Sequence, residues 1–153
     1  MLKIRYTVIL FILSLTFILS YLTPNYLQEA TLEVYDISLV YYLWAWIFAI
    51  QIIVFIPSFI FRTEHYYDLT GGITYISTVV IALILKNSYQ GIDLISLLLG
   101  SMVIIWATRL SSFLFLRVKK SGEDVRFKKI KHSFSWFLMT FMLQGMWVFM
   151  CIF

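Results

Sequence analysis

Residues 39–61, LVYYLWAWIFAIQIIVFIPSFIF, run for 23 positions without one charged side chain. A helix of about 20 apolar residues is long enough to cross the hydrocarbon core of a bilayer. Pro57 lies near its end, where a kink is tolerated inside a helical bundle. We therefore expect this stretch to span a membrane.

The rest of the chain is equally unlike a soluble domain. Hydrophobic residues make up 61% of its 153 residues and charged residues 13%, whereas soluble domains carry about 25% charged residues. Four further apolar segments are long enough to span: 6–23, 66–85, 92–116 and 133–153. We expect one all-α domain, residues 1–153, built as a polytopic membrane bundle of about five transmembrane helices.

The first segment resembles a signal peptide, and the third is short for a membrane span. Residues 6–23 follow two basic residues, as in a signal peptide, but no small-residue cleavage site follows, so we expect a retained helix. The apolar part of the third segment, 71–85, would cover only about 22 Å. Starting that helix at Tyr66 restores a full crossing and places Asp68 at its interfacial edge, with Glu64 one turn earlier.

Charge is distributed very unevenly between the connections. Lys86 lies on one side, and ten Lys and Arg residues fall on the other: Lys3, Arg5, Arg62, Arg117, Lys119, Lys120, Arg126, Lys128, Lys129 and Lys131. Because basic residues accumulate in cytoplasmic loops, we expect a cytoplasmic amino terminus in an integral, multi-pass membrane protein. The basic loop can also contact anionic lipid head groups, and nothing in it indicates a nucleic-acid partner.

Arg109 is the anomaly of the fourth segment, about 12 Å inside it when measured from Arg117. A charged side chain at such a depth marks an interior or water-filled site. The alternative is that Arg109 extends toward the interface, or pairs with Glu64 or Asp68 to hold the bundle together. A shared helical face is predicted by residues at spacings of three to four, namely Trp106, Arg109, Phe113 and Arg117, and it could hold an anionic or conjugated ligand.

Glu64 and Asp68 are four residues apart and share a helical face if the third helix begins early enough. Two such carboxylates can act as general acid and base, although they also commonly form caps or ion pairs. Tyr66 and Tyr67 could donate a proton, or serve only as interfacial aromatic residues. Gln144 lies midway along the last segment, where a buried amide needs a partner.

Metal and disulfide chemistry are not indicated. His65 and His132 lack partners at the spacing of metal ligands, so we expect no metal site. Cys151 is the single cysteine and cannot form an intramolecular disulfide.

Four phrases occur in an order that resembles a known family: RTEHYYDLTG (62–71), WATRL (106–110), GEDVRF (122–127) and LQG (143–145). The series is similar to the DUF1295-type membrane family that is grouped with the steroid 5-alpha reductases. The resemblance covers about residues 62–149. It implies a multi-span enzyme that uses NADPH to reduce a double bond conjugated to a carbonyl in a hydrophobic or lipid substrate.

The resemblance also implies roles for individual residues. Arg109 corresponds to the Arg of the reductases' His-Tyr-x-x-Arg motif, which helps to bind the cofactor, and Arg117 and Arg126 would hold the phosphates with it. Trp106 and Gln144 would lie in the substrate pocket. The expected proton donors are Glu64, Tyr67 and Asp68.

The chain departs from the reductase pattern at three places. Trp106 stands where those enzymes have a Tyr, and Phe55 stands where their Glu precedes Pro-Ser-Phe. Their carboxy-terminal cofactor motifs do not follow, so we expect an amino-terminal half that needs a second half or a partner protein. Alternatives are a non-catalytic protein that binds lipid or a partner, and a methyltransferase that uses S-adenosylmethionine.

Overall fold

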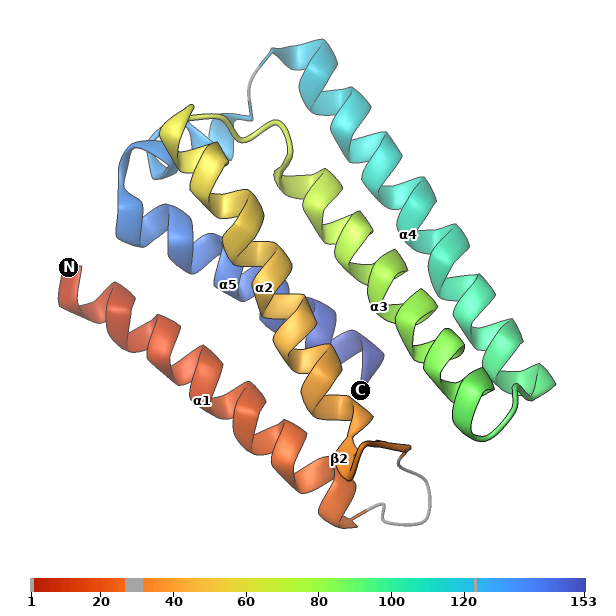
Figure 1. Cartoon of the computed structure of the whole chain (residues 1–153). Helices are drawn as coiled ribbons and strands as arrows, with labels where there is room; N and C mark the ends of the chain where they lie inside the picture. Colours follow the sequence, from red (N-terminus) through yellow and green to blue (C-terminus); the bar gives the residue numbers. More distant parts are fainter. Residues whose placement is uncertain (1, 27–31, 123) are drawn as a thin grey trace.

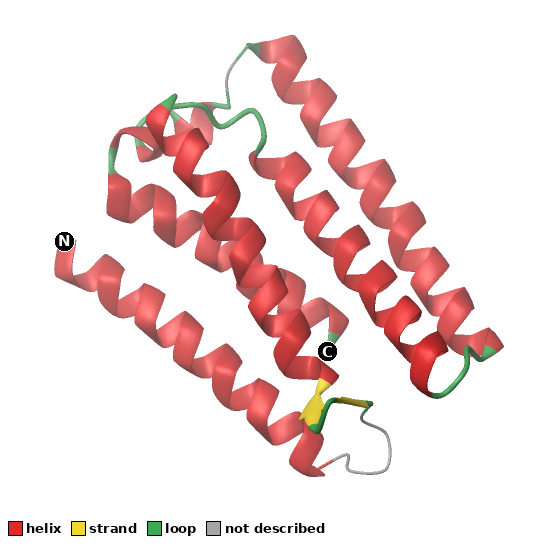
Figure 2. Cartoon of the chain, in the orientation of Figure 1, coloured by secondary structure: helices red, strands yellow, loops and turns green. Residues whose placement is uncertain are grey.

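The computed structural model describes residues 2–26, 32–122 and 124–153. Five long helices lie side by side and slope in one common direction, and little else is ordered into regular structure (Figures 1 and 2). They are α1 (Leu2–Tyr26), α2 (Leu39–Ile60), α3 (Tyr67–Tyr89), α4 (Leu94–Ser121) and α5 (Phe134–Ile152). The predicted all-α bundle is confirmed, and each of the five helices is long and apolar enough to cross a membrane.

The helix bounds differ from the predicted spans mainly at the ends. The third helix begins at Tyr67 and continues to Tyr89, beyond the predicted 66–85. The fourth continues to Ser121 instead of ending at 116, so Lys119 and Lys120 lie in its last turn. With 28 residues, α4 is about 42 Å long, so its basic last turns extend past a core of about 30 Å.

Short elements occupy the connections. Strands β1 (Glu33–Val34) and β2 (Ile37–Ser38) form a small antiparallel hairpin that the sequence analysis did not predict. Ser38 ends the hairpin and caps α2, because its side-chain oxygen accepts a hydrogen bond from the Val40 N–H. Two 3-10 turns, η1 (Val125–Phe127) and η2 (Ile130–His132), lie between α4 and α5.

The core lies around α5, which packs against α1, α2 and α3. Aromatic rings fill it: Phe137 and Phe141 are completely buried, and both pack against Phe55 of α2. In contrast, α4 lies at the edge of the bundle and packs chiefly on α3 (Figure 1). Helix α3 thus packs against α2, α4 and α5, while the outer face of α4 is uncovered.

The α3–α4 contact depends on small residues. A Cβ atom on Gly72 would lie 2.3 Å from the Cβ and Oγ atoms of Ser111, far inside van der Waals contact. The two helices approach this closely because neither position carries a larger side chain.

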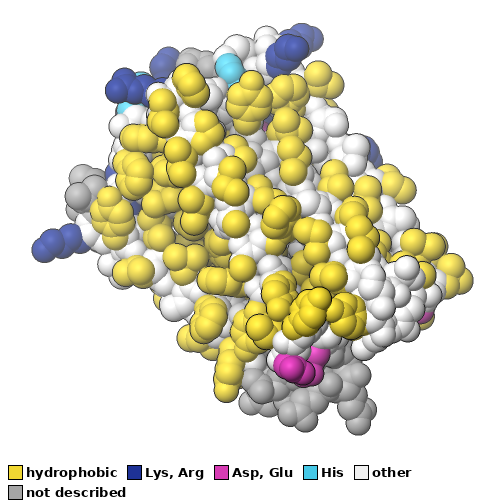
Figure 3. Space-filling view, in the orientation of Figure 1, with side chains coloured by type: hydrophobic (Ala, Val, Ile, Leu, Met, Phe, Trp, Pro, Cys, Tyr) yellow, Lys and Arg dark blue, Asp and Glu magenta, His cyan; other side chains and the backbone are white. Residues whose placement is uncertain are grey.

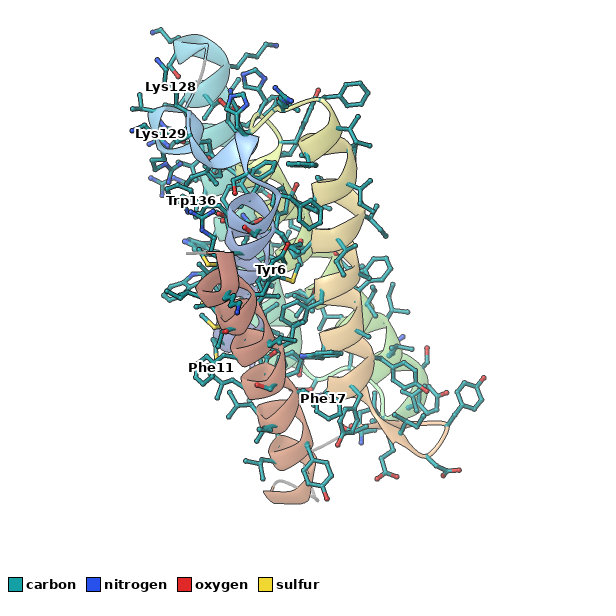
Figure 4. The ribbon with its side chains drawn as sticks, turned by 90° about the vertical axis from the view of Figure 1, so that its left-hand side faces the viewer. Tyr6, Phe11, Phe17, Lys128, Lys129 and Trp136 are labelled. Carbon is teal, nitrogen blue, oxygen red and sulfur yellow. The ribbon has the colours of Figure 1, made fainter. Side chains whose placement is uncertain are left out.

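Charge separates along the bundle. Lys and Arg side chains gather at the end that carries the 62–66 and 122–133 connections, over a body that is largely apolar (Figure 3). Lys128 and Lys129 lie at that end, whereas Phe11 and Phe17 lie along α1 (Figure 4). At the opposite end, Lys86 pairs with Asp93. We refer to these as the basic end and the opposite end.

Candidate functional site

A small cavity lies where α3, α4 and α5 meet, toward the basic end. Its volume is about 150 Å³. Three residues that were predicted as site residues line it, namely Asp68, Trp106 and Gln144, together with Gly71, Tyr75, Ser111 and Trp147 among others. Its wall is mainly apolar, so the polar atoms of Asp68 and Gln144 are its distinctive groups.

Gln144 is held in place by the start of α3. Its Nε2 atom donates a hydrogen bond of 3.1 Å to the backbone oxygen of Tyr67. A Cβ atom on Gly71 would lie 2.6 Å from that Nε2 atom, so a glycine at this position leaves room for the amide. The Oε1 atom is buried and has no hydrogen-bond partner among the described residues. An unpaired buried acceptor costs about 1–3 kcal/mol, which a ligand's donor group could recover.

Asp68 occupies the first turn of α3, where a negative charge is favoured by the helix dipole. Its carboxylate lies 3.7 Å from the guanidinium of Arg126 and is mostly buried. Arg126 is shared with a second carboxylate, because its Nε donates to Asp124 at 3.0 Å. Arg117 lies 4.0 Å from Asp124 as well. The structure thus brings Asp68, Arg117 and Arg126 into one charged network.

The hydrogen bonds of this network shift the pKa of its loop members. The Arg126 side chain holds the pKa of Asp124 below its usual value, in spite of partial burial. In return, the hydrogen bond to Asp124 raises the pKa of Arg126 above its usual value. Both groups therefore remain charged at neutral pH.

Glu64 does not lie on α3, which begins at Tyr67, so the early helix start that would put Glu64 and Asp68 on one helical face does not occur. The chain turns before the helix, with Arg62 at a φ of 50°, and the Tyr67 N–H donates to the Glu64 backbone oxygen. Glu64 is buried, and its side chain accepts hydrogen bonds from Lys131 Nζ at 2.8 Å and the Asp124 N–H at 3.2 Å. It therefore fastens the 122–133 connection to the rest of the protein.

Burial and hydrogen bonding shift the pKa of Glu64 in opposite directions. Burial alone would raise it, but the hydrogen bonds from Lys131 and the Asp124 N–H together lower it below its usual value. Glu64 is consequently an ionised member of a buried ion pair. Glu64 also does not line the cavity, so it is not placed to donate a proton to a group bound there.

Tyr67 turns away from the cavity. Its hydroxyl donates a hydrogen bond of 3.1 Å to the Thr140 backbone oxygen in α5. Its ring packs against Phe127 and Phe141, with centroid separations of 4.8 and 5.1 Å. Of the three predicted proton donors, Asp68 is therefore the one that lines the cavity.

Arg109 lies on the exposed outer surface of α4, away from the cavity and the charged network. Trp106 and Phe113, which share its face, are 46% and 63% exposed. The alternative in which Arg109 pairs with Glu64 or Asp68 is wrong, because Lys131 and Arg126 are the partners of those carboxylates. Arg109 is therefore not a member of the charged network that contains Arg117 and Arg126.

Sequence reasoning missed several residues that position the site. Lys131 and Asp124 lie 67 and 60 residues from Glu64, and no local pattern connects groups so far apart. Gly71-Gly72 was a usable signal, since adjacent glycines inside an apolar helix indicate close packing. In the described ranges, no group of three His, Cys, Asp or Glu side chains is placed to hold a metal ion.

A comparison with known protein families matches residues 54–153 to the family described as "Protein of unknown function (DUF1295)". The match covers about two thirds of the chain, including every predicted site residue. No curated protein and no solved structure matches the chain.

Proposed function

We propose that this chain, which belongs to the DUF1295 family, is a membrane oxidoreductase that uses NADPH. The family's description names no function. The proposed reaction reduces a double bond conjugated to a carbonyl in a hydrophobic or lipid substrate. The observation that carries the proposal is the carboxyl group of Asp68, which lines an apolar cavity beside Arg126 and, among the described residues, is the one acidic side chain there.

The cavity sets the kind of substrate. Typical ligand pockets measure about 300–1,000 Å³, so 150 Å³ accommodates a reacting group and not a whole lipid. The indole rings of Trp106 and Trp147 line it and are 46% and 64% exposed. The remainder of an apolar substrate would extend past these rings toward the surrounding hydrocarbon.

Asp68 is the proposed acid. NADPH, when bound, supplies a hydride to the carbon β to the carbonyl. The protonated Asp68 carboxyl then donates its proton to the α carbon, so the substrate gains one hydride and one proton. The resulting carboxylate lies beside Arg126, which stabilises its charge before a proton from solvent restores the acid.

Arg117 and Arg126 are the proposed phosphate ligands. Their side chains are 50% and 59% exposed, so phosphates can reach both guanidinium groups from the basic end. Guanidinium groups bind phosphate oxygens in pairs of parallel hydrogen bonds. Asp124 occupies both arginines in the structure, so an incoming phosphate has to compete with that carboxylate.

NADPH binding is measured first, by energy transfer from the five tryptophans to the nicotinamide during titration of the purified chain in detergent. Saturable binding is expected, with at least about tenfold weaker affinity in Arg126→Ala. Lys129→Ala is the matched control, because Lys129 is an exposed cation in the same connection. No binding to a folded chain would contradict the proposal and favour a non-catalytic protein that binds lipid or a partner.

The role of Asp68 is measured by NADPH oxidation with a long-chain α,β-unsaturated ketone. Asp68→Asn should keep NADPH binding but lower kcat about a hundredfold or more, because general acids contribute on the order of 10²–10⁴. A fully active Asp68→Asn variant would show that Asp68 is not the acid.

A further inference from the structure

The outer face of α4 presents a charge where a membrane-spanning helix faces hydrocarbon. Arg109 is exposed, and within the described part of the chain it has no hydrogen-bond or ion-pair partner. An arginine at the centre of a transmembrane helix costs about 2.5–3.5 kcal/mol in insertion experiments. A compensating anion would therefore stabilise this face.

Two further cations lie on the same face of α4. Arg109, Phe113, Arg117 and Lys120 follow one another at spacings of three and four residues, which places them along one side of a helix. Arg117 and Lys120 are about 12 and 16 Å farther toward the basic end than Arg109. Phe113 is 63% exposed and lies between the two arginines. We call these four residues the α4 cationic face.

Arg109 lies within reach of the head-group region. The Tyr66 ring packs on Phe115 of α4, with centroids 6.4 Å apart, at the level where α3 begins. Arg109 is six residues deeper than Phe115, or about 9 Å. A long arginine side chain can extend several ångströms toward the interface and keep its charged group near polar partners.

The charge decides what can cover this face. A second copy packed symmetrically here would bring two Arg109 side chains together, and like charges at close range are unfavourable. An uncharged lipid leaves the cation without a partner. A lipid phosphate provides the missing negative charge, and its acyl chains fit the apolar surface of Phe113 and Trp106.

We propose that the α4 cationic face binds the phosphate of an anionic membrane lipid, with Arg109 on the hydrocarbon side and Arg117 and Lys120 on the solvent side. Basic clusters at membrane boundaries attract anionic lipids by about 1 kcal/mol per cation, which is about fivefold in affinity. This proposal shares Arg117 with the proposed phosphate ligands of NADPH, but it does not depend on the reductase activity, because its test is made at Arg109, which is not one of those ligands.

Trp106 is a natural reporter for the test, because it is on the same side of α4 and 46% exposed. The purified chain in detergent is titrated with phosphatidylglycerol or phosphatidylcholine carrying brominated acyl chains, which quench nearby tryptophans. A Trp106→Phe variant isolates its share of the signal. Wild-type protein should be quenched at lower concentrations of phosphatidylglycerol than of phosphatidylcholine.

Three variants test the assignment. Arg109→Gln should lower the preference for phosphatidylglycerol about fivefold, and Arg109→Lys should retain most of it. Lys119→Gln is the matched control, because Lys119 lines a different depression, with His65 and Tyr66, and should preserve the preference. Unchanged thermal unfolding of Arg109→Gln would show that any loss is not caused by misfolding.

Two results would overturn the proposal. One is an unchanged preference for phosphatidylglycerol in Arg109→Gln. The other is displacement of the brominated lipid by NADPH together with loss of NADPH binding in Arg109→Gln, which would assign Arg109 to the cofactor. Inorganic phosphate serves as a third ligand; if it displaces the lipid at millimolar concentration, the face is a general phosphate site and the lipid assignment is wrong.

Discussion

Glu64 and Lys131 form an ion pair that is almost completely closed to solvent, with side chains 2% and 17% exposed. A buried pair is only marginally favourable compared with apolar residues, but loss of one partner leaves an uncompensated charge. The pair connects the start of α3 to the 122–133 connection and so holds Asp124 and Arg126 near Asp68.

Lys131→Gln should therefore destabilise the protein by about 2–3 kcal/mol, at or just below the roughly 3–5 kcal/mol of fully buried pairs, because Lys131 keeps some contact with water. The free energy of unfolding is measured by denaturant titration in detergent. The double variant Glu64→Gln, Lys131→Gln should recover most of the loss, since no buried charge remains. Equal or greater destabilisation of the double variant would contradict this account.

The same residue predicts how stability depends on pH. The folded pKa of Glu64 lies below its ordinary value of 4.5, so the unfolded chain binds its proton more readily. The stability from this group is complete above pH 4.5 and is lost as pH falls through the folded pKa. Asp124 acts in the same direction from its ordinary value of 3.8.

Thermal unfolding between pH 7 and 3 checks this dependence. The Tm should change little down to about pH 5 from these two groups and then fall, and the fall should be shallower in Glu64→Gln. A Glu64→Gln profile parallel to that of the wild type would show that Glu64 does not contribute.

At the scale of helices, hydropathy predicted the elements well and their contacts poorly. Each span is a long apolar run, so its existence follows from composition, whereas the start of α3 depends on a turn at Arg62 that hydropathy does not record. Because hydropathy does not record that turn, the sequence pattern allowed the third helix to begin early enough to include Glu64. The outward orientation of Arg109 could not be predicted either, because it depends on which face of α4 packs on α3.

The close packing of α3 on α4 can be tested by substitution at Gly72. Replacing an exposed helical glycine with alanine usually gains about 1 kcal/mol of helix propensity. At Gly72 the added Cβ would lie 2.3 Å from Ser111, and overpacking of this kind costs about 1–3 kcal/mol. The cost minus the gain leaves a net destabilisation of about 1 kcal/mol for Gly72→Ala in the same denaturant titration.

The compensating variant Gly72→Ala, Ser111→Gly should restore much of that stability, because it returns the space to the other helix. Gly71→Ala is the informative comparison, since its Cβ would meet the Gln144 amide instead of α4. It should disturb the cavity more than the helix contact. Full stability of Gly72→Ala alone would show that the helices can separate without cost.

For the whole molecule, the charge pattern along the chain predicted which connections lie together. The 62–66 and 122–133 connections meet at the basic end, and their contacts, from Glu64 to Lys131 and from Asp68 to Arg126, hold the candidate site together. The sequence predicted Asp68, Arg117 and Arg126 as site residues but could not indicate that they share one network. Such pairings depend on how the helices are placed side by side.

The charge pattern also predicts how the protein is oriented in the membrane. Lys and Arg accumulate on the cytoplasmic side of membrane proteins, so the basic end should face the cytoplasm. In a Cys151→Ala background, a cysteine is placed at each end, at exposed positions in the connections: Gln90→Cys at the opposite end and Lys129→Cys at the basic end. A membrane-impermeant maleimide should label Gln90→Cys in intact cells, and Lys129→Cys only after permeabilisation. The reverse pattern would place the basic end outside and would separate Asp68 and its arginines from the cytoplasmic NADPH that the proposed reaction requires.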